Sequence, residues 1–477
     1  MAGWAGFASA GDWFGIHVVD DGTGRGVPMV NLTTTNGIRV TSDSAGWIAF
    51  QEPGLMDRSV HFEIEGSGYT HQKDGFGFQG VVLTPKAGEE VELRLMRVAL
   101  AERMYRVTGQ GIYRDATLLG KDIPLPRPLL NGNVMGQDSV QVVPFQGRLF
   151  WIWGDTLRPQ HPLGNFRSTG GWSDLPDSGG LDPSVGVHLD YFLKNGGDVA
   201  PMAAASGEGV VWLDGLMAVK EGEDGEVLVA HYSRRKSLTE ELEHGIAVYR
   251  PVREEFVPTV VLGEEFRWQH PRGQAVLGDG DRYWYFAAPF CTTRVKADLN
   301  SVLNPTTYEA LAWSEEKGEY VWQSRDEPVT QSGENEAIRE GKLKSTEALL
   351  QVKDALSEKA VAFHGGSVRW NEYRKRWIAI AVQKDGEGSM LGHVWYAEAQ
   401  NVTGPWRRAI RVAEHPKYSF YNPTHHDFFD QEGGRIIYFE GTYSSMFSGA
   451  ASPVPRYDYN QIMYRLDMGD PRLEDVH

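Results

Sequence analysis

Residues 147–155 read Gly-Arg-Leu-Phe-Trp-Ile-Trp-Gly-Asp, an apolar and aromatic run with turn residues at both ends. Four more runs of this kind follow along the chain, which gives five copies in all. They occupy residues 225–231, 281–287, 375–382 and 434–440. Short apolar runs bounded by turn residues predict strands that are buried on both faces. The sequence therefore predicts a β-rich repeat.

Each of these runs follows another apolar strand, so every copy is predicted to be an antiparallel unit. The first strands of the units are expected to begin near Asp138, Asp214, Arg272, His364 and His425. The spacing between successive first strands exceeds the roughly 40–50 residues of a four-stranded propeller blade. This difference predicts blades with long insertions. One such insertion, Glu334 to about Leu356, has helical periodicity and good helix formers.

The five copies favour a five-bladed β-propeller over an array of sandwiches. Strands that are apolar on both faces are typical of blades stacked between neighbouring blades. The first strands of a propeller line a central channel, so residues far apart in the sequence meet at its mouth. The 55 glycines fit the many tight turns that such a fold requires.

The N-terminal part of the chain has a different pattern. Short β-rich runs separated by turn residues predict a β-sandwich over residues 1–98. Gly-Val-Pro-Met-Val at 26–30 and Thr-Ser-Asp-Ser-Ala-Gly-Trp-Ile-Ala-Phe at 41–50 resemble the carboxypeptidase-regulatory-like, transthyretin-type modules of bacterial secreted enzymes. That resemblance implies a non-catalytic module. Residues 99–133 are expected to be a connector, and residues 134–477 to be the propeller and catalytic domain. The fold class is therefore all-β.

The overall composition excludes several classes of function. The net charge of −17 disfavours binding to nucleic acid or to an anionic membrane surface. The only cysteine, Cys291, excludes an internal disulfide framework and any cysteine-based zinc site. We expect a secreted or periplasmic bacterial protein whose export signal was removed before Met1.

Three acidic residues at strand starts and ends are the candidate catalytic residues. Asp138 opens the first strand of unit one, Asp155 ends its second strand, and Glu440 closes the matching strand of unit five. Units one and five are neighbours in a closed ring, so these carboxylates are predicted to share one mouth. Glycosidic cleavage needs one carboxyl group as acid and another as base or nucleophile. A purely structural role in turns is the alternative for each of them.

Substrate-binding residues are predicted around the carboxylates. The candidates are Trp153, Asp214, Arg272, His364, His425, His426, Tyr443, Arg456 and Tyr457. The aromatic members are expected to stack on sugar rings. Asp214 interrupts an apolar strand, where it either pairs with Arg272 or a histidine or lines the channel. Arg456 belongs to a mixed cluster that either clamps an acidic sugar or pairs with the last strand.

Histidines give a second signal at the same mouth. His364, His425 and His426 are expected at first-strand starts, and His270 precedes another. Imidazoles hydrogen-bond sugar hydroxyls, transfer protons or bind metal ions. The predicted reaction requires no cofactor; a divalent metal held by His364, His425 and Asp427 is an alternative that depends wholly on geometry, since no short ligand motif occurs.

The opening of the repeat resembles a known family. Gly-Gln-Asp-Ser at 136–139, followed by the run at 147–156, resembles the first blade of five-bladed-propeller glycoside hydrolases that include bacterial endo-D-arabinanases. Thr-Gly-Pro-Trp at 403–406 resembles an outer-strand phrase of the arabinanase, xylosidase and levansucrase groups. The first resemblance implies that Asp138 and Asp155 are the catalytic carboxylates.

The arabinanase and xylosidase groups imply a different set. They place a base Asp on blade one, a modulating Asp on blade two and an acid Glu on blade three. Asp138 and Asp214 fit the first two roles, but unit three has no Glu at the corresponding strand. The acid would then be Asp155 or Glu440.

The function predicted from these residues is hydrolysis of a glycosidic bond in an oligo- or polysaccharide at the propeller mouth. The partner is the saccharide, with no nucleic acid and no membrane. One rival is a metal-assisted polysaccharide lyase with His and Tyr as base and acid and with Arg272 or Arg456 neutralising a uronate. The other rival is a non-catalytic glycan-binding propeller.

Overall fold

The computed structural model describes residues 10–476 except 161–166, 195, 204–206, 223–224, 271–272, 279, 281, 325–326 and 451. Strands dominate this part of the chain, and its α-helices are short: α1 (Arg114–Leu118), α2 (Leu299–Val302) and α3 (Gln331–Arg339). The predicted all-β class is confirmed. Among the described residues, the helices all lack the length and apolar character needed to cross a bilayer.

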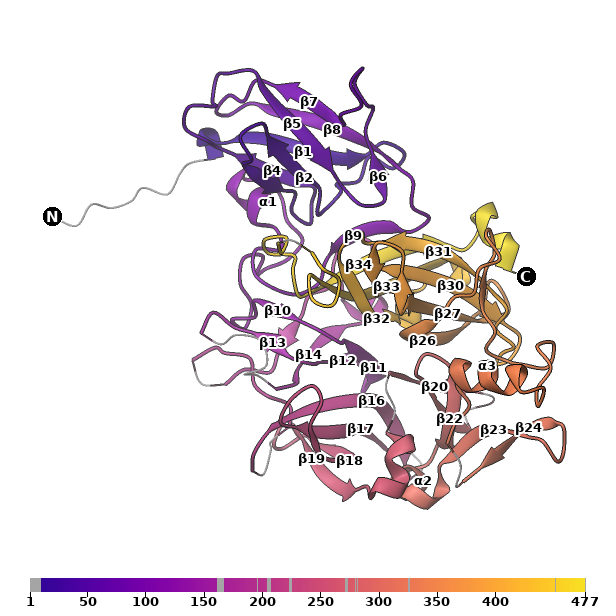
Figure 1. Ribbon diagram of the computed structural model, residues 1–477. Coiled ribbons are helices and arrows are strands. Elements are labelled where there is room, and N and C mark those ends of the chain that lie inside the picture. The colour runs from indigo at the N-terminus through magenta and orange to yellow at the C-terminus, as the bar shows by residue number, and fades with distance from the viewer. Residues whose placement is uncertain are drawn as a thin grey trace.

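Two four-stranded sheets form the N-terminal part, at the top of Figure 1. The first has the order β4-β1-β8-β6 and is made of β1 (Phe14–Asp20), β4 (Trp47–Phe50), β6 (Tyr69–Thr70) and β8 (Glu90–Arg97). The second has the order β3-β2-β5-β7 and is made of β2 (Asn31–Thr34), β3 (Arg39–Thr41), β5 (Val60–Glu65) and β7 (Gly80–Leu83). Both sheets contribute to one apolar core, in which Ile16, Leu32 and Phe62 are fully buried.

The remaining larger sheets of the described chain follow one another in sequence. Sheet one contains β11 (Gln141–Phe145), β12 (Arg148–Trp153), β14 (Thr169–Asp174) and β15 (Asp190–Tyr191). Sheet two contains β16 (Val210–Glu221), β17 (Gly225–Arg235), β18 (Glu241–Arg250) and β19 (Glu255–Val261). Sheet three contains β20 (Gln274–Gly278), β21 (Tyr283–Ala287), β22 (Cys291–Lys296), β23 (Glu309–Ser314) and β24 (Glu319–Gln323).

Sheets four and five complete this series. Sheet four contains β25 (Lys353–Asp354), β26 (Phe363–Asn371), β27 (Arg376–Gln383), β30 (His393–Ala399) and β31 (Arg408–Glu414). Sheet five contains β32 (Ser419–His425), β33 (Ile436–Ser444), β34 (Asn460–Asp467) and β9 (Glu102–Arg106). Two small pairs are β10 (Gly136–Gln137) with β13 (Thr156–Leu157), and β28 (Asp385–Gly386) with β29 (Ser389–Met390).

The first strands of the five sheets form a closed ring. β11 contacts β16, β16 contacts β20, β20 contacts β26 and β26 contacts β32, and Figure 1 shows these strands around the middle of the ring. β32 then returns to sheet one, where Thr424 Oγ1 donates to the carbonyl of Val140 (3.3 Å). Residues about 280 positions apart are thereby brought into contact, as a ring of sheets requires.

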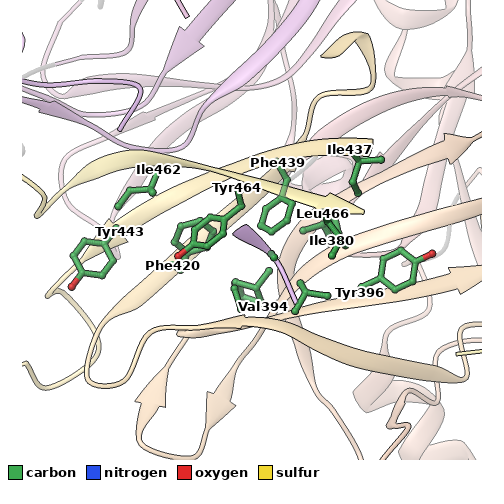
Figure 2. Close-up of a cluster of buried hydrophobic side chains, with 14 of the residues drawn as sticks. Ile380, Val394, Tyr396, Phe420, Ile437, Phe439, Tyr443, Ile462, Tyr464 and Leu466 are labelled. Carbon is green, nitrogen blue, oxygen red and sulfur yellow. The ribbon is translucent and has the colours of Figure 1, made fainter. Parts of the chain in front are cut away.

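Apolar side chains fill the spaces between neighbouring sheets. Figure 2 shows one such layer, to which sheet four contributes Ile380 and Tyr396 and sheet five contributes Phe439 and Tyr464. The ring of Tyr464 stacks on that of Phe439 with centroids 5.5 Å apart. Full burial of each such side chain stabilises the fold by roughly 1.5–3 kcal/mol. The second strands are therefore apolar on both faces because each is covered on both sides.

Sheet five ends in a strand from the other end of the chain. β9 directly follows the N-terminal sheets and pairs with β34, with Arg106 opposite Ile462. Residues 102–106 were expected in the connector, and they include the charged residues Glu102, Arg103 and Arg106. All three are buried: Glu102 pairs with Arg465 (3.3 Å) and Arg103 donates to the carbonyl of Pro28 (3.0 Å).

The first strand of sheet five differs from the expectation as well. It begins at Ser419 and ends at His425, whereas a start near His425 was predicted. The register shifts between Tyr421 and Thr424, and this bulge accommodates Pro423, which has no N–H to donate. The expected helical insertion is also shorter than predicted, since α3 ends at Arg339.

Candidate active site

Asp138 lies between the small β10–β13 pair and the β11–β12 ladder of sheet one. β10 pairs with β13 on one side of it and β11 pairs with β12 on the other. Its carbonyl accepts from Gly154 N–H (2.8 Å), and its N–H donates to the carbonyl of Asp155 (3.3 Å). The next residue, Ser139, has a φ of 53°, so the strand is interrupted here. The backbone therefore brings positions 138 and 155 together at the end of β12.

Tyrosines hold the Asp138 carboxylate. The Tyr421 hydroxyl donates to its Oδ2 (2.9 Å), and Tyr459 also hydrogen-bonds it. Burial raises the pKa of Asp138 to about 6, although both tyrosine hydrogen bonds act to lower it. Both tyrosines come from the sheet-five end of the ring, so ring closure completes this site.

Asp155 faces the same site from the end of β12. It is 9% exposed, and its Oδ1 accepts a hydrogen bond from the indole N–H of Trp212 on β16 (2.9 Å). Burial, followed by the charge of Asp138, raises the pKa of Asp155 to about 7, while the hydrogen bond from Trp212 opposes the increase. The two aspartates are thus close enough to repel each other electrostatically, and they titrate as a pair.

Partly exposed aromatic rings and polar groups surround the pair. Trp212 is half-buried and carries the Arg235 guanidinium 5.5 Å from its ring centre. Phe447 is 48% exposed and packs edge-on against Tyr421, with centroids 6.0 Å apart. Asn422 Nδ2 donates to Ser139 Oγ (2.9 Å), which joins sheets five and one beside the aspartates.

Asp214 lies at the junction of the first strands. Its Oδ1 accepts from the N–H groups of Gly215 (2.9 Å) and Gly273 (3.1 Å), and from the side chain of Gln141. These bonds tie sheets one, two and three together at the channel. Arg272, the partner predicted for Asp214, lies outside the described residues.

Glu440 occupies a different environment from the aspartate pair. β33 continues to Ser444, so Glu440 is in mid-strand and fully buried between sheets five and one. Its Oε1 lies 2.7 Å from Nε2 of His426, which is itself fully buried and edge-on to Trp151. Burial raises the pKa of Glu440 to about 8 and lowers that of His426 to about 3. At neutral pH both groups are uncharged, and the protonated carboxyl donates to the imidazole. We therefore leave Glu440 and His426 out of the catalytic set.

The other histidines are not gathered at one mouth. His425 ends β32, is buried, and bonds Asp430 Oδ1 through Nε2 (2.8 Å). Asp427 lies 3.6 Å from the Arg369 guanidinium, and His364 is exposed on β26. Over the ranges that the structure describes, no group of three or more His, Cys, Asp or Glu side chains is placed to hold a metal ion. The expected ligand set of His364, His425 and Asp427 is therefore dispersed.

The remaining predicted substrate-binding residues lie away from the aspartates. Trp153 is 1% exposed and stacks on Trp151 in the core between sheets five and one, because alternate residues of β12 face that core. Tyr443 is buried and stacks on Tyr418, with centroids 4.7 Å apart. Neither ring presents an exposed face on which a sugar could stack.

Arg456 and Tyr457 attach the N-terminal sheets to the ring. The Tyr457 hydroxyl donates to the carbonyl of Ser42 (2.7 Å) and accepts from Met29 N–H (3.2 Å). Arg456 Nη2 lies 3.6 Å from Asp115 Oδ2. Both residues therefore have a structural role that their sequence neighbourhood did not reveal.

Four residues around the aspartates were not predicted from the sequence: Trp212, Tyr421, Tyr459 and Phe447. Trp212 stands two residues before Asp214, and Tyr421 precedes Asn422 and Pro423, a pattern that resembles a turn. A bulge in β32 explains that pattern equally well, and it would have placed Tyr421 at the mouth.

No family model and no curated protein matches the chain. Solved structures with a related arrangement include a GH43 β-1,3-galactosidase, with 8% identity, a TM-score of 0.38, and coverage of 76% of this chain and 59% of that one. An exo-1,5-α-L-arabinanase from a bovine ruminal metagenomic library has 9% identity, a TM-score of 0.37, and coverage of 70% and 93%. A Cellvibrio cellulosa α-L-arabinanase complexed with arabinohexaose has 11% identity, a TM-score of 0.37, and coverage of 70% and 92%. The chain thus spans 59% of the length of the first of these structures. Evidence for its function comes from the residues of the chain itself.

Proposed function

We propose that the protein is a glycoside hydrolase that cleaves an oligo- or polysaccharide between Asp138 and Asp155. The observation that carries this proposal is the meeting of the two carboxyl groups at the end of β12, where Tyr421 holds one and Trp212 holds the other. Paired carboxyl groups with raised pKa values, flanked by aromatic rings, are the groups that glycosidic cleavage uses.

The surroundings of the two aspartates assign their roles. Asp138 receives hydrogen bonds from two tyrosines, which stabilise its charged form. Asp155 receives one, from Trp212, and is exposed to the charge of Asp138. The proton therefore resides preferentially on Asp155. Asp155 is the general acid that protonates the leaving oxygen, and Asp138 is the nucleophile or the base that activates water.

Neighbouring groups supply binding and orientation. The half-buried face of Trp212 and the exposed face of Phe447 provide stacking surfaces for sugar rings. Asp214 fixes the first strands of sheets two and three against sheet one. The reaction as proposed uses protein side chains and water, and requires no metal ion.

The same proposal covers the organisation of the chain. The ring of sheets is a five-bladed β-propeller that forms the catalytic domain over residues 134–477, completed by β9. The N-terminal sheets are an appended carboxypeptidase-regulatory-like sandwich. The protein is a secreted bacterial polysaccharide-degrading enzyme, and its partner is the saccharide.

The test is release of reducing ends from arabinan, xylan, galactan, laminarin and mycobacterial arabinogalactan. Asp138→Asn is expected to lower turnover by at least about a thousandfold with unchanged folding. Asp155→Asn is expected to lose turnover on polymers but to retain it on aryl glycosides whose leaving group needs no proton. Asp177→Asn, at an exposed turn after β14, is the matched control.

Three results would overturn the proposal. Wild-type turnover in Asp138→Asn would remove the aspartate pair from the reaction. Unsaturated products that disappear with EDTA would show a metal-assisted lyase, and tight binding of a polymer with no product would show a glycan-binding protein.

A further inference from the structure

A groove of about 550 Å³ separates the N-terminal sheets from the ring. Its N-terminal wall comes from β2, β3, β5 and the hairpin that follows β6, and its ring wall comes from residues 415–418 with Tyr443 and Val454. Ligand pockets usually span roughly 300–1000 Å³. The groove therefore has room for a short stretch of a saccharide chain.

The two walls of the groove are held in fixed positions. Arg103, which is buried, donates to the carbonyls of Pro28 (3.0 Å) and Ser67 (2.9 Å) on the N-terminal side. Ser67 Oγ donates in turn to the carbonyl of Glu414 in sheet four. A groove built this way keeps its shape without a ligand, which reduces the entropic cost of binding.

An aromatic platform lies on the ring side. Tyr418 is half-buried, stacks on Tyr443 at an interplanar angle of 19°, and donates its hydroxyl to the carbonyl of Ser452 (2.5 Å). Phe78, on the N-terminal hairpin, also lines the groove and is 57% exposed. Flat, immobilised rings with an exposed face are suited to stacking against the C–H face of a sugar.

The charges along the groove balance. Arg39 and Lys73 contribute two positive charges, and Glu63 and Glu65 contribute two negative ones, all exposed. Arg39 and Glu65 lie 3.8 Å apart, and both act electrostatically on Tyr418 across the groove. A lining of this kind offers many hydrogen-bonding groups and no net attraction for a polyanion, which favours a neutral polyhydroxy ligand.

The groove opens on the edge of sheet five that also carries the aspartate site. Tyr418 directly precedes β32, whereas Tyr421, three residues later, bonds Asp138. The loop after β33 connects the two places: Ser448 Oγ donates to the carbonyl of Lys417 (2.7 Å), and Phe447 packs on Tyr421. One extended chain bound at the aspartates can therefore continue along this edge into the groove.

We infer that the groove is a second saccharide site, which binds a neutral polysaccharide remote from the bond that is cleaved. The inference rests on the proposed function for the identity of the polymer, but it concerns binding alone. It predicts that long chains are preferred over short oligosaccharides, because only long chains occupy both places.

The experiment uses the full chain carrying Asp138→Asn, titrated with arabinan, xylan, galactan and laminarin, with polygalacturonate as the acidic polymer. A neutral polymer is expected to bind, and Tyr418→Ala is expected to weaken that binding about tenfold. Tyr373→Ala, an exposed tyrosine elsewhere on the ring, is the control. Phe78→Ala is expected to weaken binding as well, whereas Phe76→Ala, which is 91% exposed and does not line the groove, leaves it unchanged.

The outcomes separate this inference from the proposed function. In the catalytically active chain, Tyr418→Ala is expected to lower kcat/KM on polymer but not on short oligosaccharides. Equal binding by Tyr418→Ala and its control, tighter binding of polygalacturonate, or no binding of any polymer overturns the inference. If one of these results is found but the polymer is still hydrolysed, the catalytic roles of Asp138 and Asp155 are retained. If the groove binds polymer but no polymer is hydrolysed, only the catalytic proposal is overturned.

Discussion

A Cβ at position 154 would lie 2.2 Å from Oδ1 of Asp138, so the Asp138 carboxylate occupies the space that any side chain at Gly154 would need. Real Cβ atoms do not approach other atoms this closely. Gly154 is therefore part of the site, because its lack of a side chain leaves room for the Asp138 carboxylate beside the backbone that leads to Asp155.

Gly154→Ala is expected to displace the Asp138 side chain from Tyr421. We expect turnover to fall at least about a hundredfold, since small displacements of a catalytic group are costly. Measurement of kcat on the best polymer, together with the melting temperature, checks this. Gly75→Ala is the control, because a Cβ there meets no atom within 4 Å. Unaltered turnover in Gly154→Ala would show that Asp138 does not need its present position.

The pH dependence of kcat/KM is expected to be a narrow bell. Activity rises with pH as the pair loses its first proton at about 6, which leaves Asp138 charged, and falls as it loses the second, from Asp155, at about 7. Trp212→Phe removes the N–H that stabilises the Asp155 carboxylate, so the alkaline limb is expected to move to higher pH while the acid limb stays. Trp370→Phe is the matched control, since that indole donates to Glu372 (3.0 Å) on the surface. An alkaline limb that moves to lower pH would contradict the assignment of Asp155 as the acid.

Glu440→Gln is expected to leave turnover within about twofold of wild type, because a glutamine amide donates to His426 as the protonated carboxyl does. The pKa of Glu440 is raised from its ordinary value to about 8 in the folded protein. Its contribution to stability is therefore full below about pH 4 and is lost as pH rises through 8. Between pH 6 and pH 9, the melting temperature of the wild type is expected to fall more steeply than that of Glu440→Gln. Loss of activity in the folded variant would return Glu440 to the catalytic set.

Tyr457→Phe is expected to destabilise the protein by about 1 kcal/mol, because it removes the two buried hydrogen bonds of the hydroxyl, to the Ser42 carbonyl and from the Met29 N–H, while those two groups keep the bond to each other (3.1 Å). Urea denaturation of the variant beside Tyr373→Phe measures the difference. Turnover at low temperature is expected to be unchanged, and a selective loss of turnover would show that Tyr457 touches the substrate.

The repeat of buried strands made the all-β class predictable, because a strand covered on both sides has to be apolar on both sides. Asp138 and Asp155 were also predictable as a pair, since two strands joined by one turn separate them. The positions of the site residues that sheet five contributes were not predictable. β32 begins at Ser419 and continues through a bulge to His425, so Tyr421 lies near its start and His425 at its end, and the four extra residues of β33 place Glu440 in the interior. Hydrophobic periodicity does not report such shifts, because a bulged strand and a turn use the same Asn and Pro residues.

The pairing of β9 with β34 also has a consequence for the order of folding. Arg106 of β9 lies opposite Ile462 of β34, so this pairing joins segments 356 positions apart. β9 is therefore synthesised long before its partner, and closing so long a loop is slow compared with forming local hairpins. Until β34 has been synthesised, sheet five cannot be completed.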